Sequence, residues 1–255
     1  MPEYMVSELV SIITPAYRVE SIIDHTIASV VGQTYSNWEM LIADDCSPDN
    51  TAAVVAAAAA KDSRIRLLKC AKNGGPAAAR NLALGAAKGR WIAFLDSDDL
   101  WLPTKLEETL EYAQSRQSAL TFTGYRRISH DGDKVGEFKS VPETVSYSQL
   151  LGNTAIATST VMIDRMQTGD LTMKLVYYDD FACWLEILKK GHVAHGLNKD
   201  LMRYRVVKNS VSRNKWKSAK EVWKSYRNIE RRNIWKSIWY FASYSWNAYF
   251  KYRNF

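Results

Sequence analysis

Cysteine, histidine and long apolar runs are scarce in this sequence of 255 residues, and each shortage excludes a class of protein. The three cysteines are Cys46, Cys70 and Cys183. Because they are odd in number and lack the spacing of a metal site, a secreted disulfide scaffold is excluded and a reducing compartment is expected. The four histidines also show no ligand spacing. The N-terminal stretch MPEYMVSELV has no basic region, so a signal peptide is not expected.

Neither of the two longest uncharged runs suits a membrane span. Residues 144–163 contain nine Ser, Thr, Asn or Gln residues. Residues 237–250 number only 14, whereas a helix needs about 20 residues to cross a bilayer. With 47% hydrophobic and 24% charged residues, the chain can bury a core, and a disordered or fibrous chain is excluded.

The net charge of +7 is concentrated near the C-terminus. Residues 215–255 hold ten Lys or Arg, two Glu and 13 of the 30 aromatic residues. The preceding 214 residues hold 24 basic and 25 acidic residues, which nearly cancel. The sequence therefore predicts a near-neutral body, residues 1–213, followed by a basic, aromatic and helical tail, residues 214–255.

The first hundred residues alternate between apolar strands and helices. Strands are predicted at residues 9–14, 39–43, 65–69 and 91–95, with helices between them. Strands 25 to 30 residues apart with intervening helices form βαβ units, so we expect an α/β fold with a mostly parallel sheet. Beyond a helix starting at Pro103 the pattern is weaker. Strands are expected there at 120–126 and 157–163, and a short helix at 181–190.

Acidic residues follow two of the predicted strands. Asp44 and Asp45 end the second strand, and Asp96, Asp98 and Asp99 follow the fourth. Because the carboxyl ends of parallel strands meet at one edge of a sheet, these carboxylates are expected to converge. Like charges repel unless a cation compensates them, and Mg²⁺ or Mn²⁺ prefers oxygen ligands. For any single acid, capping of a turn is the alternative.

A second acidic pair, Asp179–Asp180, precedes an apolar helix. Negative charge stabilises a helix N-terminus, which is one interpretation of the pair. The other is a general base that faces the first half of the fold from the second.

The chain resembles the family 2 glycosyltransferases, which have the GT-A fold, in six segments taken in order: SIITPAY (11–17), QTYSNWEMLIADDCSPDNT (33–51), NGGPAAARN (73–81), GRWIAFLDSDD (89–99), YDDFACWLEILKKG (178–191) and YRVVKNSVS (204–212). The resemblance covers roughly residues 8–213. It implies a GT-A catalytic domain with a nucleotide-binding half, residues 1–100, and an acceptor half, residues 101–213. The tail segment KSAKEVWKSYRNIE resembles the branch that assembles bacterial O-antigen and capsule.

The resemblance also implies roles for individual residues. The residues implied to bind the nucleotide-sugar are Pro15, Tyr17, Asp44, Asp45, Arg80, Asp96 and Arg205. Asp98 matches the metal ligand of a D-x-D motif, and Asp180 matches the catalytic base, with Trp184 four residues further on. Arg205 and the loop through Ser212 resemble a lid over the donor diphosphate.

Two departures from the family pattern stand out. The first acid of the pair that contains the base is Asp179, where the family has Glu. The late loop has Val206 and Val207 where the family often has His, so Lys208 is the expected source of positive charge.

The residues and the resemblance together predict an inverting, metal-dependent glycosyltransferase with a UDP-sugar donor. One carboxylate base suffices for a single displacement, and no second nucleophile is evident. The expected acceptor is a lipid-linked saccharide of bacterial surface polysaccharide or lipopolysaccharide. The alternatives are a sugar nucleotidyltransferase and a non-enzymatic peripheral membrane protein. A nucleic-acid binder is disfavoured by the acidic cluster, although the basic tail would suit one.

The tail predicts a cytoplasmic enzyme held on the inner face of the bacterial membrane. Basic helices rich in Trp and Tyr suit an anionic membrane surface. The alternative is that Trp216, Trp223 and Trp235 pack on the body and the lysines are merely solvated.

Overall fold

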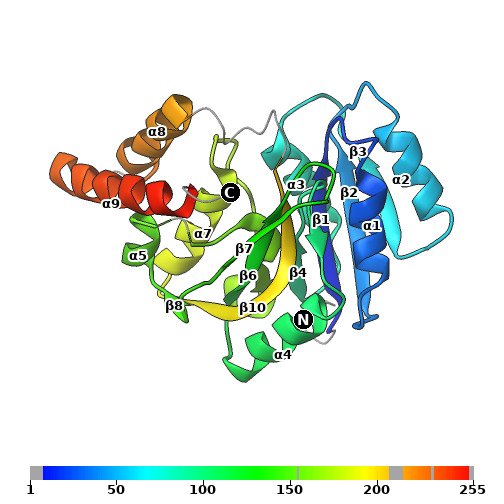
Figure 1. Ribbon diagram of the computed structural model, residues 1–255, viewed down its shortest axis with the longest axis horizontal. Coiled ribbons are helices and arrows are strands. Elements are labelled where there is room, and N and C mark those ends of the chain that lie inside the picture. Colours follow the sequence, from blue (N-terminus) through cyan, green and yellow to red (C-terminus); the bar gives the residue numbers. More distant parts are fainter. Residues whose placement is uncertain (1–7, 154, 207–214, 231–232, 253–255) are drawn as a thin grey trace.

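The computed structural model describes residues 8–153, 155–206, 215–230 and 233–252 (Figure 1). One ten-stranded sheet runs through the body, in the order β3-β2-β1-β4-β9-β6-β10-β5. The other two of the ten strands lie off this path: β7 pairs with β6, and β8 pairs with β10.

The first half of the sheet is entirely parallel. Its strands are β1 (Val10–Ala16), β2 (Trp38–Asp44), β3 (Ile65–Lys69) and β4 (Trp91–Phe94), and its helices are α1 (Ile23–Val31), α2 (Thr51–Ala59) and α3 (Pro76–Ala86). β1 is flanked by β2 and β4, both parallel to it. The four predicted strands and the βαβ units are confirmed. Pro15 is tolerated in β1 because pairing with β4 has ended at Ile13.

The second half is mixed. Its elements are β5 (Leu100–Trp101), α4 (Lys105–Ser115), β6 (Leu120–Ile128), β7 (Val135–Lys139), β8 (Thr144–Val145), α5 (Tyr147–Leu151), the 3₁₀ turn η2 (Thr158–Thr160), β9 (Met162–Asp164), α6 (Arg165–Thr168), α7 (Asp179–Lys189) and β10 (Ala194–Arg205). The short β9 is antiparallel to both β4 and β6 and so joins the two halves of the sheet.

One expectation for the second half was wrong in detail, and one strand was missed. The strand expected at 157–163 is the η2 turn followed by β9, because the backbone of Thr160 and Val161 bonds back to Ala157 and Thr158. The long strand β10 was not predicted. Its sequence AHGLNKDLMRYR does not alternate, and its pairing with β6 shifts register twice, at Leu197/Asp200 and Asp200/Arg203.

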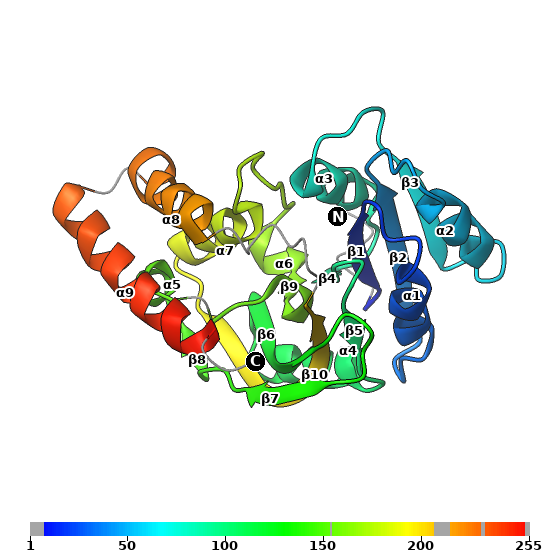
Figure 2. The same ribbon diagram turned by 45° about the horizontal axis from the view of Figure 1, so that its top comes forward.

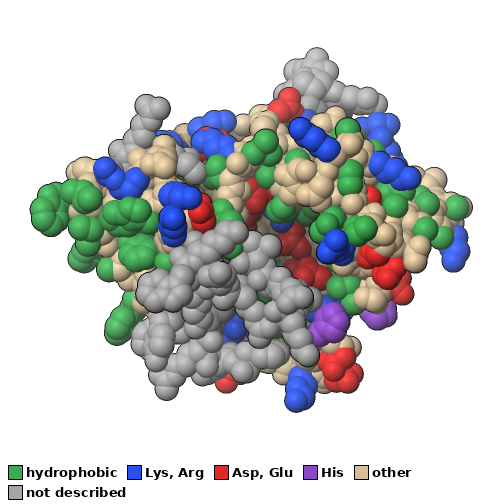
Figure 3. Space-filling view, turned by 90° about the horizontal axis from the view of Figure 1, so that it is seen from above, with side chains coloured by type: hydrophobic (Ala, Val, Ile, Leu, Met, Phe, Trp, Pro, Cys, Tyr) green, Lys and Arg blue, Asp and Glu red, His purple; other side chains and the backbone are tan. Residues whose placement is uncertain are grey.

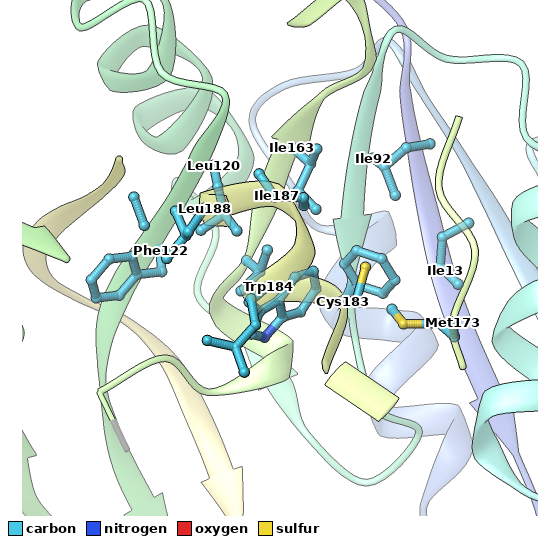
Figure 4. Packing of buried hydrophobic residues seen from close by; sticks show 14 of the residues in the cluster. Ile13, Ile92, Leu120, Phe122, Ile163, Met173, Cys183, Trp184, Ile187 and Leu188 are labelled. Carbon is cyan, nitrogen blue, oxygen red and sulfur yellow. The ribbon is translucent and has the colours of Figure 1, made fainter. Parts of the chain in front are cut away.

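The two faces of the sheet carry separate cores. One core packs α1, α2 and α4 against side chains such as Ile12, and the other packs α3 and α7 against the opposite face, which includes Ile13. Trp184 of α7 is 1% exposed and lies among the side chains of this second core (Figure 4). Its ring meets Phe94 of β4 edge-on, with centroids 5.2 Å apart. This contact fixes α7 over the end of β4.

A short segment before α4 forms a second join between the halves. β5 pairs with β10, while the side chain of Gln33, after α1, bonds to the carbonyl of Leu102 and the N–H of Leu106. Lys105 is fully buried there, with Nζ 3.9 Å from the centroid of the Trp101 ring.

The tail forms α8 (Lys215–Lys224), a π-helical turn η4 (Ser225–Ile229) and α9 (Ile234–Tyr252). These helices lie at the end of the molecule opposite α1 and α2 (Figures 1 and 2). Val222 and Tyr226 are buried in the core on the α7 side. No helix within the described residues is long and apolar enough to cross a membrane.

The alternative in which the tail's tryptophans pack on the body is contradicted at Trp235 and is not shown at Trp223, whose aromatic partner also belongs to the tail. Trp223 is partly buried and meets Phe241 edge-on at 5.8 Å, whereas Trp235 is 78% exposed. The side chain of Trp216 lies outside the described residues. The division at residue 213 stays a prediction, since it falls within the undescribed stretch 207–214.

Candidate active site

The site begins at the end of β2, where Asp45 organises a neighbouring loop. Its Oδ1 accepts the N–H of Gly74 at 2.8 Å and its Oδ2 accepts the N–H of Gly75 at 2.7 Å. Gly75 has φ +81°, a conformation that glycine adopts without strain, and it directly precedes Pro76 at the start of α3. Asp45, 3% exposed, thus holds the N-terminus of α3 beside the strand ends.

Asp44 offers an unused acceptor at the same place. Its Oδ2 accepts the N–H of Ser47 at 3.2 Å, but its Oδ1 is buried and has no hydrogen-bond partner among the described residues. A buried carboxylate oxygen without a donor is unfavourable. A bound molecule with an N–H or O–H at this point would satisfy it.

The loop after β4 carries three acids with different surroundings. Asp96 accepts Nη2 of Arg80 at 2.6 Å, and its side chain is 30% exposed. Burial and the nearby Asp96 raise the pKa of Asp98 to about 6. Burial, with Asp98 and Asp96 close by, raises the pKa of Asp99 as well. Three carboxyl groups are therefore held close together at the end of β4, two of them in surroundings that disfavour their charged form.

Asp99 ties the loop to the second half of the fold. It accepts Oγ of Ser159 at 2.6 Å and the backbone N–H of Arg205 at 2.9 Å, and it is 1% exposed. The guanidinium of Arg205 donates to the carbonyls of Asp98 at 2.8 Å and His130 at 2.6 Å. Arg205 thus braces the Asp98 loop, and its contact with a donor diphosphate stays a prediction.

Arg80 bridges the halves at the centre of the site. It extends from α3, is 6% exposed, and donates to Asp96 and, through Nη1, to Asp179 at 2.6 Å. Burial alone would lower the pKa of Arg80, but Asp96 and Asp179 outweigh it and raise that pKa. Its Nε has no hydrogen-bond partner within the described residues. Arg80 accordingly acts as a brace between the β4 loop and α7.

The pair at the start of α7 is split between two roles. Asp179 is buried and forms an ion pair with Arg80. Burial raises the pKa of Asp179, and the positive charge of Arg80 opposes that rise. Asp180 is partly exposed and accepts the hydroxyl of Thr158 at 2.5 Å. The carboxylate of Asp180 therefore has a fixed orientation and remains accessible.

The η2 turn was missed by reasoning from the sequence. Thr158 holds Asp180, and Ser159 also accepts the N–H of Asp96 at 3.0 Å, so this turn touches both acidic groups. A run of Thr and Ser in TSTV carries no motif of its own, and only its burial beside the acids shows its role.

The remaining predicted residues lie at the rim or outside the description. Pro15 is partly buried at the end of β1, and Tyr17 is 42% exposed just beyond it. Lys208 and Ser212 lie outside the described residues. Seen from above, acidic side chains gather near the middle of the molecule (Figure 3).

The carboxylates of Asp96 and Asp98 are oxygen ligands of the kind that a divalent cation takes, but they would supply only part of its coordination shell. Asp98 makes no ion pair and no hydrogen bond to another side chain within the described stretches, and its pKa is raised first by burial and then by Asp96, against the opposing effect of Arg205 and Arg80. No group of three or more His, Cys, Asp or Glu in the described residues forms a complete metal site. Mg²⁺ and related ions commonly take one or two carboxylates and complete their shell with water and substrate phosphates.

Comparison with known proteins identifies the family. The model of glycosyl transferase family 2 matches residues 11–166. The chain belongs to glycosyl transferase family 2. It is 46% identical over 241 residues to the putative teichuronic acid biosynthesis glycosyltransferase TuaG of Bacillus subtilis, covering 94% of this chain and 96% of that relative.

A second family 2 relative has a more specific name. The chain is 40% identical over 217 residues, 84% of each chain, to the UDP-Glc:alpha-D-GlcNAc-diphosphoundecaprenol beta-1,3-glucosyltransferase WfgD of Escherichia coli. The resemblance to bacterial polysaccharide glycosyltransferases is thus confirmed.

Solved structures confirm the GT-A fold. TarS of S. aureus (residues 1–349, in complex with UDP-GlcNAc) superposes with a TM-score of 0.71 at 18% identity, covering 96% of this chain and 73% of that one. The mannosyltransferase PcManGT of Pyrobaculum calidifontis, in complex with GDP-Man and Mn2+, gives 0.70 at 17% identity, covering 93% and 69%.

Proposed function

We propose that this glycosyltransferase moves a sugar from a UDP-sugar to a hydroxyl group of a lipid-linked saccharide, with inversion at the anomeric carbon, in the synthesis of a bacterial surface polysaccharide. The observation that carries the proposal is the arrangement around Arg80, with Asp96 and Asp98 on one side and Asp180 on the other. A donor held at Asp96 and Asp98 would present its sugar toward Asp180.

The choice of donor and acceptor is supported by the relatives. The name of WfgD specifies a UDP-glucose donor and a diphosphoundecaprenol-linked acceptor, and TarS was solved with UDP-GlcNAc. The unpaired Oδ1 of Asp44 suits the N–H of a uracil ring, and the exposed Tyr17 ring suits stacking on that base. In this proposal Asp45 holds the loop beneath the base, and Asp96 lies on the ribose side.

Asp98, with Asp96 beside it, would hold Mn²⁺ or Mg²⁺, which supplies Lewis-acid neutralisation of the departing diphosphate. The Mn2+ in the PcManGT structure supports a divalent metal. Arg205 keeps the Asp98 carbonyl in place, and Asp99 secures Arg205 in turn, so the loop is organised before a ligand arrives.

Asp180 would act as the general base. Its orientation is fixed by Thr158, and as a carboxylate it would take the proton of the acceptor hydroxyl as that oxygen attacks the anomeric carbon. A single displacement of this kind inverts the configuration. A retaining reaction through a glycosyl-enzyme would need a second carboxyl group as nucleophile, about 5–5.5 Å from the first.

The test of the metal role is Asp98→Asn. We expect this variant to fold normally and to lose metal-dependent binding of UDP, measured by calorimetry with and without MnCl₂. Asp133→Asn, an exposed acid in the turn before β7, is the matched control and should bind as the wild type does. Full turnover by Asp98→Asn, or by the wild type in excess EDTA, contradicts the metal role.

An analysis of the products separates the proposed transferase from a sugar nucleotidyltransferase. Transfer of a sugar releases UDP, whereas a sugar nucleotidyltransferase releases or consumes pyrophosphate. A product analysis that finds pyrophosphate and no UDP overturns the proposed reaction. In this proposal the enzyme works at the cytoplasmic face of the membrane as a peripheral protein, because its acceptor is anchored in lipid.

A further inference from the structure

One face of α9 is apolar and open to solvent. Trp235, Trp239 and Trp246 are 78%, 73% and 67% exposed, and Ile234 and Ile238 beside them are about half exposed. Positions 235, 239 and 246 are four and seven residues apart, so their side chains lie along one side of the helix. We call these five residues the tryptophan stripe. Isolated exposed apolar residues are ordinary, but a continuous stripe marks an interaction surface.

The opposite side of α9 is fastened to the body. Ser237 is fully buried, and Tyr240, Phe241 and Tyr244 pack on the core. Ser243 Oγ and Asn247 Nδ2 both donate to the carbonyl of Gly152, at 3.0 and 2.7 Å. Because these contacts fix the rotation of α9, the tryptophan stripe cannot turn inward.

The chemistry around the stripe favours one occupant. The sequence of α9, IWKSIWYFASYSWNAYFKY, has no acidic residue, and Lys236 is exposed next to the stripe. Lys220 on α8 is exposed as well, and residues 215–255 carry eight more positive than negative charges. Trp rings with adjacent cations suit the headgroup region of an anionic bilayer.

We propose that the tryptophan stripe inserts into the interface between headgroups and acyl chains of an anionic membrane, with α9 lying parallel to the bilayer plane. The stripe runs from Ile234 to Trp246, so at about 1.5 Å per residue it offers a contact roughly 18 Å long. The identity of this partner rests on the proposed function, in which the acceptor is anchored in lipid. A second copy of the chain is the competing occupant.

Contacts between the tail and α7 connect the tryptophan stripe to the active site. Glu230, in the connection between η4 and α9, accepts Nζ of Lys189 at 2.9 Å and the hydroxyl of Tyr147. Lys189 ends α7, and Asp180 lies at its beginning, 9 residues earlier and about 14 Å away along the axis. The membrane contact and the proposed base are therefore attached to the two ends of one helix.

The experiment measures vesicle binding without any sugar nucleotide. The full-length protein is floated with liposomes of phosphatidylcholine and phosphatidylglycerol, and the double variant Trp235→Ser/Trp239→Ser is compared with it. We expect at least about tenfold weaker partitioning for the variant, since burial of each large side chain is removed. Val31→Ser, which removes an exposed apolar side chain on α1 at the other end of the molecule, is the control and should partition like the wild type.

Two further readouts keep the outcomes distinct. Circular dichroism and UDP release with a water-soluble acceptor should be unchanged in the double variant, so failure of the proposed reaction is recorded separately from failure of membrane binding. Equal partitioning of wild type and variant overturns the proposal. So does a wild-type dimer in light scattering that the double variant converts to a monomer without any vesicle binding, because the stripe would then join two copies.

Discussion

The two halves of the body place their functional groups by different means. In the first half, parallel strands end at one edge, and the backbone alone brings Asp44 near Asp96 and Asp98. In the second half, Asp180 lies at a helix N-terminus whose position depends on side chains: Trp184 on Phe94, Asp179 on Arg80, and Thr158 on Asp180 itself. The donor side is thus fixed by topology and the acceptor side by a few contacts.

This difference has a consequence for how each side responds to substitution. Removing one carboxylate at the strand ends leaves the strands in place, so a loss of ligand binding is expected with little loss of stability. Removing a contact that holds α7 alters the relative position of the halves. A misplacement of about 1 Å at the reacting atoms can lower a rate by about 10²-fold.

The largest effect is expected from Asp180→Asn. The amide keeps the shape but cannot accept a proton, so kcat should fall by about 10² to 10⁴, or roughly 3 to 5 kcal/mol of barrier. UDP affinity by calorimetry should change little, because Asp180 belongs to the acceptor side. Asp179→Asn should lower kcat much less. If Asp179→Asn is the more damaging of the two, the assignment of the base is wrong.

A smaller effect is expected from Arg80→Lys, which tests the brace between the halves. A guanidinium serves two carboxylates in a fixed geometry, whereas an ammonium is a point charge on a flexible stem. We expect a loss of about 2 kcal/mol in the free energy of unfolding in urea, and a fall in kcat with UDP affinity nearly retained. Arg66→Lys, whose Arg is half-exposed and contacts Glu39 at 3.5 Å, is the control. A variant with wild-type stability and kcat contradicts the role of Arg80.

The smallest effect is expected in the pH dependence of stability, from Lys105 in the segment before α4 that connects the two halves. Burial lowers the pKa of Lys105 to about 7 from 10.5. The unfolded chain therefore binds more protons than the folded one above that pH, so stability rises with pH from about 7 toward 10.5 and is flat below it. Between pH 6.5 and 8.5 the gain is about 1–2 kcal/mol. Lys105→Met should remove this rise, as seen in urea unfolding at both pH values. An identical pH dependence in wild type and variant excludes Lys105 as its source.

The same contrast explains how much of the molecule could be predicted from the sequence. The parallel half was predictable because buried strands and helices alternate at regular spacing and acids follow two of its four strands. The resemblance singled out Asp98 and Asp180. In the structure Arg80 binds a close sequence neighbour of each, Asp96 and Asp179. The catalytic roles of Asp98 and Asp180 stay predictions.

The second half was less predictable for physical reasons. β10 is held by pairing with β5, β6 and β8 and not by an alternating pattern, and β9 has only three residues. Thr158 and Asp99 act as hydrogen-bonding partners within a buried network, which depends on tertiary contact and leaves no periodic signal. The shared role of Arg80 also arises only when Asp179, 99 residues away, folds back onto α3.

β9 is synthesised well after β4, the strand that it pairs with, and this order has a consequence for folding on the ribosome. β4 ends at Phe94, and its partner β9 begins at Met162, 68 positions further along the chain. At about 5 to 20 residues per second, roughly 3 to 14 seconds pass between the emergence of one and the other. During that interval the parallel half exposes the unpaired edge of β4, together with Phe94, which later packs on Trp184. An unpaired edge beside apolar surface promotes aggregation, so the nascent first half is the stage at which chaperone binding matters most for this enzyme.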